Sequence, residues 1–500
     1  MRHFILFSFF ILSGISLFSQ STSFSANYTP INGSYNCGLG VGALSNTTGS
    51  NNTALGIYSM FGNSTGEFNC AVGRAALYSN TTANNNTALG DFSMFSNTTG
   101  DNNTAIGNAS LSSNSGGNYN IAIGPFSLNS STDANSNMAI GVNSMLTNTT
   151  GDYNLAVGNE SLRSNTTGRE NLAIGVGSMY TNDTGLYNTC VGNRTLFLNT
   201  FGSNNNAFGN DALHSNTTGY NNIAMGNDAL YNNTTGGFNI SIGVSGMVNN
   251  TTGYQNTGIG NNNLLSNTTG YANSGIGTNV LYSNTTGFSN TAIGRSSMYY
   301  NTTGSNNTAV GRNSLVNNST GNYNTAIGDS AGFNSTGNKN VYLGFGAGFR
   351  ETGNNKLYVA NDTTNAIIYG DFSTKQILLG KTNPVGYAFK GNRTLNVLGG
   401  ILADSVRIAL SSNWADYVFN EDYKPMPLED VEKYIKENKH LPNIPSENQV
   451  KSEGIQLSEM NSKLLEKIEE LTLYLLQQQK EIQSLKNKLD DIANNKQPSN

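Results

Sequence analysis

A repeat of 17 residues runs through most of this chain and restricts the folds open to it. Glycine recurs in phase from Gly56 to Gly328, and Gly40 and Gly344 lie one residue out of step at the two ends. One copy reads N-T-A-I-G-x-x-S-L-x-x-N-T-T-G-x-x. A fixed period of this size indicates a repeat architecture in which each copy is one structural unit stacked on its neighbours.

Each position of the repeat has its own physical role, and positions are numbered here from the in-phase glycine. Position −4 is Asn in every copy from Asn52 to Asn324, and stacked amides can form a hydrogen-bonded ladder. Position −1 is always apolar, and position +4 is Leu or Met from Met60 to Leu315. We predict that positions −1 and +4 form the core. The Asn-Thr-Thr-Gly segment is typical of a turn.

The predicted fold is mainly β, a parallel β-roll or solenoid of 17-residue coils. Gly and Asn are poor helix formers, and the apolar positions do not follow a spacing of 3.6 residues, so the repeats are not helical. One copy has room for two short strands and two turns. Stacked coils rise about 4.8 Å each, which predicts a rod roughly 80 Å long.

Position −2 is small throughout, as at Ala54, Ala71, Ala173 and Ala309. Side chains alternate between faces along a strand, so position −2 points outward if position −1 points inward. A solvent face would accumulate polar residues, whereas small side chains let another backbone approach closely. We therefore predict that these alanines form an oligomer contact. Small residues required by tight turns in a lone solenoid are the alternative.

The motif N-x-A-[IV]-G-x-x-S recurs without a register slip over about residues 36–345 and resembles the head repeats of trimeric autotransporter adhesins, the YadA-like heads. The resemblance implies a left-handed parallel β-roll, three chains side by side and a surface that binds host matrix or other cells. The coils of those heads are shorter, and the extra residues here fall in the Asn-Thr-Thr-Gly turn. That family also ends in a membrane anchor, which we do not expect in this chain.

Short strands are expected after the repeats. Apolar runs between Gly, Asn and Asp turns predict strands at 341–343, 356–360, 366–369 and 376–379, with two further candidates in 395–410. Pro427 opens a predicted helix that ends near Asn438, and Pro442 and Pro445 impose an extended link.

The last long segment has a heptad pattern. Its two seam positions are occupied by Leu457, Leu464, Leu471, Gln478, Leu485 and Ile492, and by Asn461, Ile468, Leu475, Ile482 and Leu489. This pattern predicts an α-helical coiled coil, in which Ile468, Leu471, Leu475, Ile482 and Leu485 form an oligomer contact. A mixture of Leu and Ile permits trimers. An amphipathic helix on a globular core is the alternative.

The C-terminal region also has a resemblance of its own. The strings NKLYVAND, IYGDF, WADYVF, HLPNIPS and EMNSKLLEKIEELTLYLLQQQKEI are similar to the C-terminal region of secreted bacterial tail-fibre-like proteins. The resemblance implies that this region sets the register of three chains. Some relatives cleave themselves at a Ser-Asp-x-Arg-Leu-Lys string. Residues 403–408 read Ala-Asp-Ser-Val-Arg-Ile, which is a different string, so we expect no autocleavage.

The N-terminus has the layout of a secretory signal peptide. Arg2 and His3 precede an apolar run from Phe4 to Phe18, which is short for a spanning helix, and an uncleaved anchor is the alternative. We expect a secreted or cell-surface protein without a transmembrane anchor in the mature chain. The predicted domains are a signal peptide (1–20), a rod (21–345), a β-rich neck (346–411), a helix and proline-containing linker (412–456), a coiled coil (457–493) and a disordered tail (494–500).

The sequence predicts neither a catalytic site nor a metal site. The histidines are His3, His214 and His440, and none has a partner at metal or triad spacing. The three cysteines are expected to be small buried residues without disulfides. A net charge of −5 without a basic block argues against nucleic acid. We expect no cofactor, no metal and no enzyme activity.

Aromatic residues supply the candidate ligand-binding surface. One set lies in the turn and comprises Tyr119, Tyr153, Tyr187, Tyr220, Tyr254, Tyr271 and Phe288; another lies at position +5 and includes Tyr180, Phe197 and Tyr231. Aromatic side chains among polar neighbours suit glycans or protein partners, and packing between turns and neighbouring chains is the alternative. The expected function is that of an exported, homotrimeric adhesive fibre that attaches to cells, matrix or glycans. A phage-like or injection-device tail fibre is the second hypothesis, and an ice-binding solenoid is the third.

Overall fold

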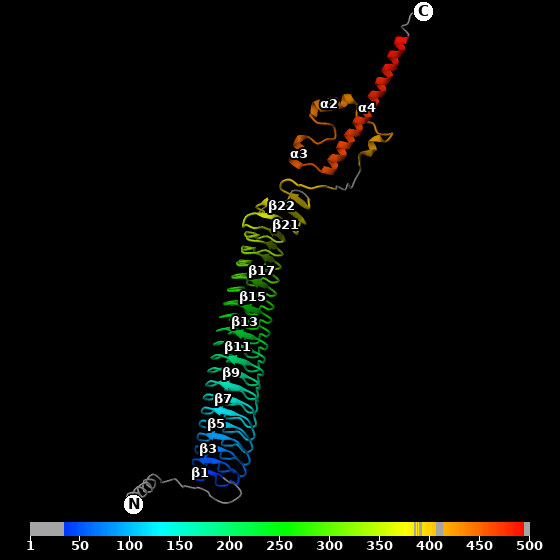
Figure 1. Cartoon of the computed structure of the whole chain (residues 1–500). Helices are drawn as coiled ribbons and strands as arrows, with labels where there is room; N and C mark the ends of the chain where they lie inside the picture. Colours follow the sequence, from blue (N-terminus) through cyan, green and yellow to red (C-terminus); the bar gives the residue numbers. More distant parts are fainter. Residues whose placement is uncertain (1–34, 385–386, 388, 390–392, 407–413, 495–500) are drawn as a thin grey trace, which may run out of the picture. The chain divides into compact units, whose positions relative to one another are not determined.

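The computed structural model describes residues 35–384, 387, 389, 393–406 and 414–494 (Figure 1). The predicted signal peptide and nearly all of the predicted disordered tail therefore lie outside the described residues. The chain divides into two compact units, Met1–Gly399 and Gly400–Asn500, and each is described by itself. The described part of the first unit is a stack of coils along one axis, which confirms the parallel β-solenoid.

One three-residue strand marks each coil of the stack. The strands are β1 (Cys37–Leu39), β2 (Thr53–Leu55), β3 (Cys70–Val72), β4 (Thr87–Leu89), β5 (Thr104–Ile106), β6 (Ile121–Ile123), β7 (Met138–Ile140), β8 (Leu155–Val157), β9 (Leu172–Ile174), β10 (Thr189–Val191), β11 (Asn206–Phe208), β12 (Ile223–Met225), β13 (Ile240–Ile242), β14 (Thr257–Ile259), β15 (Ser274–Ile276), β16 (Thr291–Ile293), β17 (Thr308–Val310), β18 (Thr325–Ile327) and β19 (Val341–Leu343). Each pairs in parallel with the next, so equivalent repeat positions lie side by side, as Ala156 does with Ala173.

The expectation of two strands per coil is wrong. On the side away from the strand, coils are still joined by backbone hydrogen bonds, as where the N–H of Met60 donates to the carbonyl of Ala76 at 2.9 Å. Positions +2 and +4 there have positive φ, with values of 58° at Phe92 and 47° at Met94. Left-handed residues interrupt an extended strand, so this side of the coil is a series of turns.

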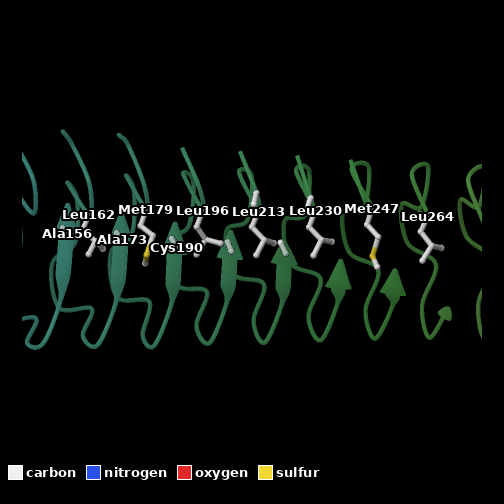
Figure 2. Packing of buried hydrophobic residues seen from close by; sticks show 14 of the residues in the cluster. Ala156, Leu162, Ala173, Met179, Cys190, Leu196, Leu213, Leu230, Met247 and Leu264 are labelled. Carbon is white, nitrogen blue, oxygen red and sulfur yellow. The ribbon is translucent and has the colours of Figure 1, made fainter. Parts of the chain in front are cut away.

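The interior of the coil contains positions −2 and +4, and position −1 lies outside. Ala54, Ala71, Ala173 and Ala309 are all 0% exposed within one chain. Figure 2 shows Ala156 and Ala173 on their strands beside Leu162 and Met179 in the interior. The predicted core role of position +4 is confirmed, and that of position −1 is wrong. Because Leu or Met already fills the thin interior, only a small side chain fits opposite it.

Two buried ladders of asparagine complete the interior. At position −4, the backbone N–H of Asn188 donates to Oδ1 of Asn171 at 3.0 Å, and its Nδ2 donates to the carbonyl of Gly202 at 2.9 Å. At position +7, Nδ2 of Asn182 donates to Oδ1 of Asn165 at 2.7 Å. The predicted ladder at position −4 is confirmed. Buried amides are stable here because the next coil supplies their partners.

At the C-terminal end of the stack, further strands continue the sheet, and one small buried residue of the repeat is replaced by a large one. β20 (Lys356–Val359) pairs in parallel with β19, and β21 (Ala366–Asp371) and β22 (Gln376–Thr382) continue the sheet as antiparallel strands. Tyr342 occupies position −2 and is 0% exposed. It fits because Gly348 occupies position +4 of the same coil, where a Cβ would lie 2.2 Å from the Tyr342 ring.

The strands expected at 341–343, 356–360, 366–369 and 376–379 are confirmed within a few residues. In the 395–410 segment the described residues contain β23 (Leu395–Val397), and the part from 407 onward lies outside the described residues.

The second unit is helical. It contains η1 (Ala415–Phe419), α2 (Leu428–Asn438), α3 (Glu447–Glu453) and α4 (Leu457–Asn494). The predicted helix after Pro427 is confirmed as α2. α3 was not predicted; it begins at a capping box in which Ser446 and Gln449 bond reciprocally. α4 confirms the predicted helix over the heptads.

Candidate interaction surfaces

Position −1 forms an apolar strip along the outer face of the strands. The strip comprises Leu39, Leu55, Val72, Leu89, Ile106, Ile123, Ile140, Val157, Ile174, Val191, Phe208, Met225, Ile242, Ile259, Ile276, Ile293, Val310, Ile327 and Leu343, and none of them is buried. Exposure reaches 45% at Leu89 and 46% at Ile327. Position −3 shares this face and carries no charged residue from Cys37 to Val341. A continuous exposed apolar surface of this kind marks an interaction site.

The predicted oligomer contact through position −2 is wrong. Ala54, Ala71, Ala173 and Ala309 lie inside their own coils and cannot touch another chain. The strip takes their place as the surface that is free for contact. One signal in the sequence could have revealed this. At the end of the rod, Tyr342 replaces the small residue of position −2 while Gly348 replaces the Leu of position +4, an exchange of volume expected of residues that share one core.

The cysteines also divide between the two faces. Cys190 is buried at position −2, and burial raises the pKa of its thiol. Cys37 at position −3 is exposed and Cys70 is partly exposed, so the expectation that all three are buried is wrong. All three are free thiols.

The predicted ligand-binding aromatics fall into two neighbouring columns. Tyr119, Tyr153 and Tyr187 occupy position −5 in alternate coils, with exposed fractions of 65%, 64% and 49%. Their φ angles lie near 58°, in the left-handed region. Within the described residues, no aromatic ring stacks on any of these three side chains. Their faces are therefore available to a ligand.

The remaining residues of the predicted ligand-binding set occupy position −6, and their rings contact other aromatic rings. Tyr254 stacks on Tyr271 with 4.9 Å between ring centroids and 1° between planes, and Tyr271 stacks on Phe288 in the same way. Tyr220 meets Phe238 edge to face at 5.2 Å. The central faces of the Tyr254–Tyr271–Phe288 ladder are covered by the neighbouring rings, so mainly edges remain for a partner.

The aromatic set at position +5 is also a stack within the chain. His214 lies between Phe197 and Tyr231, with centroid distances of 5.3 and 4.8 Å and planes within 7° of parallel. Burial lowers the pKa of His214, Asp211 opposes this shift and Arg194 adds to it. Stacking between successive turns thus accounts for this column without a ligand.

An open hollow of about 510 Å³ lies at the edge of the strand face. Tyr153, Leu155, Glu170, Asn171 and Leu172 line it. The Asn171 side chain is engaged in the buried ladder, where it donates to the carbonyl of Gly185 at 2.8 Å. The groups left to a ligand are an aromatic ring, two leucine side chains and a carboxylate.

In the second unit, α4 is covered on its polar side. The Tyr417 hydroxyl donates to Glu466 Oε2 at 2.7 Å, and Asn443 Nδ2 donates to Glu466 Oε1 at 3.2 Å. Tyr423 donates to Glu470. The bond to Glu466, together with burial, raises the pKa of Tyr417 to about 12. The segment 415–443 therefore acts as a strap over the acidic side of the helix.

The predicted seam of α4 lies on the opposite, uncovered side. Ile468, Leu471, Leu475, Ile482 and Leu485 are 59%, 57%, 57%, 49% and 64% exposed. The alternative of an amphipathic helix whose apolar side packs on a globular core does not fit, because the covered side is the acidic one. Along the described part of the chain, the seam has no partner.

The described residues contain no group of three or more His, Cys, Asp or Glu side chains that could hold a metal ion. Over the same residues, no helix combines the length and apolar character needed to cross a bilayer. The fold thus defines a parallel β-solenoid followed by a helical unit, each with an unpartnered apolar surface. No family model, curated protein or solved structure matches this chain.

Proposed function

We propose that this protein is an exported homotrimeric fibre that displays its rod at the cell surface and attaches to cells, matrix or glycans. The observation that carries the proposal is the pair of unpartnered apolar surfaces. The rod exposes the strip, as at Ile174, and α4 exposes its seam, as at Leu471. A single soluble chain would leave both in water.

Burial of the strip gives association enough driving force. Covering a half-exposed Ile or Val contributes about 1 kcal/mol, and the strip repeats this contribution in every coil from β1 to β19. The loss of translational and rotational freedom costs about 4–15 kcal/mol. The absence of charge on position −1 lets another copy approach along the strip without desolvating an ion.

Three chains, rather than two, are supported by the seam and by the resemblance of the repeats to YadA-like heads. The Leu and Ile mixture along Ile468, Leu471 and Leu475 is compatible with a trimeric coiled coil. The strap contacts the acidic side of the helix, and the seam on the other side is exposed. A trimer would therefore bury the seam without displacing Tyr417 or Tyr423.

The adhesive role is supported by the exposed faces of Tyr119, Tyr153 and Tyr187, which are suited to sugar rings and protein surfaces. To test it, the full chain is coated on beads and binding to matrix proteins, cells and a glycan array is measured. A variant with all three tyrosines replaced by Asn, the residue of Asn102 and Asn204 at the same position, is the control. We expect binding that the variant loses. Equal binding of the wild-type chain and the triple variant would contradict the adhesive role.

A phage-like or injection-device tail fibre is the second candidate, favoured by the strapped helix in the C-terminal region that resembles tail-fibre-like proteins. Cell fractionation separates the two. An adhesin is expected on the surface of intact producing cells, whereas a tail fibre is expected to sediment with tail-like particles.

A further inference from the structure

We propose that the hollow at Tyr153 and Glu170 binds an arginine side chain presented by a protein partner. The inference deepens the proposed adhesive function and rests on it for its biological meaning. The hollow offers a carboxylate, an aromatic face and an apolar floor, and these three groups match the three parts of an arginine side chain. A guanidinium pairs with carboxylates and stacks on aromatic faces, and its aliphatic stem packs on leucine.

The groups of the hollow are held on a rigid frame. Tyr153 and Glu170 occupy position −5 in successive coils, and both have positive φ, 58° and 57°. Their backbones are fixed by ladder bonds, as where the N–H of Glu170 donates to the carbonyl of Asp152 at 3.1 Å. Leu155 and Leu172 lie side by side in paired strands and form the floor. The backbone beneath the site is therefore preorganised, which limits the entropy lost on binding.

The charge of Glu170 has no partner within the described residues. Glu170 is exposed and takes part in none of the ion pairs of the rod. The neighbouring Arg169 likewise forms no ion pair with it. The nearby carboxylate of Asp152 accepts a hydrogen bond from the N–H of Asn135 at 2.7 Å, which occupies one of its oxygens. An incoming guanidinium therefore meets an unpaired carboxylate.

The chain already contains the completed form of this arrangement. Arg74 lies over the ring of Phe92 at 4.7 Å and approaches Asp91 Oδ2 at 3.7 Å. Arg163 likewise lies over the ring of Tyr180 at 5.2 Å and donates to its hydroxyl at 3.0 Å. In the hollow, Tyr153 and Glu170 supply the ring and the carboxylate, and the guanidinium is the part that a partner would bring.

The hollow is local and does not recur along the rod. Position −5 carries a carboxylate only at Glu170 among the copies from Gly40 to Gly344. The floor is equally unusual, because position −3 is Thr in many copies but Leu at both Leu155 and Leu172. The site is thus built from three residues that depart from the repeat, Glu170, Leu155 and Leu172. The strip, by contrast, is periodic and can contact another copy along its whole length.

The test uses the full chain and the probe N-acetyl-arginine methylamide, with binding measured by saturation-transfer NMR and calorimetry. The citrulline and lysine analogues are the control probes. Glu170→Asn and Tyr153→Asn each place at position −5 a residue that the repeat already uses there, so the coil is preserved. We expect each variant to bind the arginine probe about tenfold more weakly. Tyr323→Asn changes an exposed tyrosine at position −5 whose neighbours at that position, Asn306 and Lys339, are not carboxylates, and it is expected to leave binding unchanged.

Three results would overturn the proposal. They are an absence of binding to the wild-type chain, unchanged binding in Glu170→Asn, and equal binding of the citrulline or lysine analogue. Probe binding is measured on the purified protein and does not depend on adhesion. An arginine site in a protein that attaches to no surface would contradict the proposed function alone, whereas adhesion without probe binding would contradict this site alone.

Discussion

Ala173 and Ile174 are consecutive residues of β9 that lie on opposite sides of the coil wall. Ala173 is 0% exposed in the interior, and Ile174 is 37% exposed on the strip. The same relation recurs along the repeats. The small residue at position −2 packs inside its own coil, and the large apolar residue at position −1 is free to contact a partner. Substitutions at the two positions should consequently affect different properties.

Replacement of Ala173 by Gln should unfold its coil, because a long polar side chain has no space beside Leu162 and Met179. Ile174→Gln should leave the coil folded and weaken the trimer, by about 1–2 kcal/mol for each chain. Circular dichroism reports the fold and sedimentation velocity reports the assembly. Thr167→Gln, at an exposed position away from the strip, is the matched control. A trimer that is weakened equally by Ile174→Gln and Thr167→Gln would exclude the strip as the contact.

Position +4 should reject β-branched residues. Leu213 has a φ of 52°, and a β-branched side chain is strained in this region. Leu213→Ile conserves volume but should destabilise the protein by about 1–3 kcal/mol. Leu213→Met, which matches Met179 at the equivalent position, should cost less than about 1.5 kcal/mol. Thermal melting compares the two variants, and equal melting temperatures would show that the backbone does not impose this preference.

Acid should weaken the stack around His214. Burial lowers the pKa of His214 in the folded chain, so the unfolded chain takes up this proton first as the pH falls. The contribution of the neutral ring is complete above the ordinary pKa of about 6.5 and is lost as the pH falls from there through the lowered value. His214→Phe removes the titration and keeps the stack. The difference in melting temperature between the variant and the wild type should grow from pH 7.5 to pH 5, and a constant difference would contradict this assignment.

The two sides of α4 should respond differently to substitution. Ile468→Asn places a third polar residue in the seam, beside Asn461 and Gln478, and should weaken assembly. Tyr417→Phe removes one hydrogen bond to Glu466, worth about 1 kcal/mol, and should loosen the strap while the assembly persists. Hydrogen exchange measures the strap and light scattering measures the assembly. Loss of assembly in Tyr417→Phe with retention in Ile468→Asn would reverse the roles of the two sides.

The period of the repeat was sufficient to predict the solenoid, the Asn171–Asn188 ladder and the core role of residues such as Leu162. It could not decide which side of the strand faces inward, because alternation states only that Ala173 and Ile174 point in opposite directions. That choice depends on the volume left opposite Leu162, which is a property of the whole coil. The exchange of sizes at Tyr342 and Gly348 is one place where the sequence records it.

The single strand per coil has a signal that is easily missed. Positions −5, +2 and +4 adopt positive φ, and from Gly56 to Gly328 none of them holds Val, Ile or Thr. The strap on α4 has no such signal in the sequence. The hydrogen bond from Tyr417 to Glu466 joins residues that are 49 positions apart, in a region that has no repeat. The hollow at Glu170 is likewise visible only where the repeat departs from its consensus.

The mass of the full chain in solution tests the central claim most directly. Sedimentation equilibrium at micromolar concentration should give three times the mass of one 53.1-kDa chain, with a correspondingly smaller value if residues 1–20 have been removed. The strip and the seam are then both covered. A monomer that stays soluble at the same concentration would show that the strip is stable in water and would contradict the assembly on which the proposed function depends.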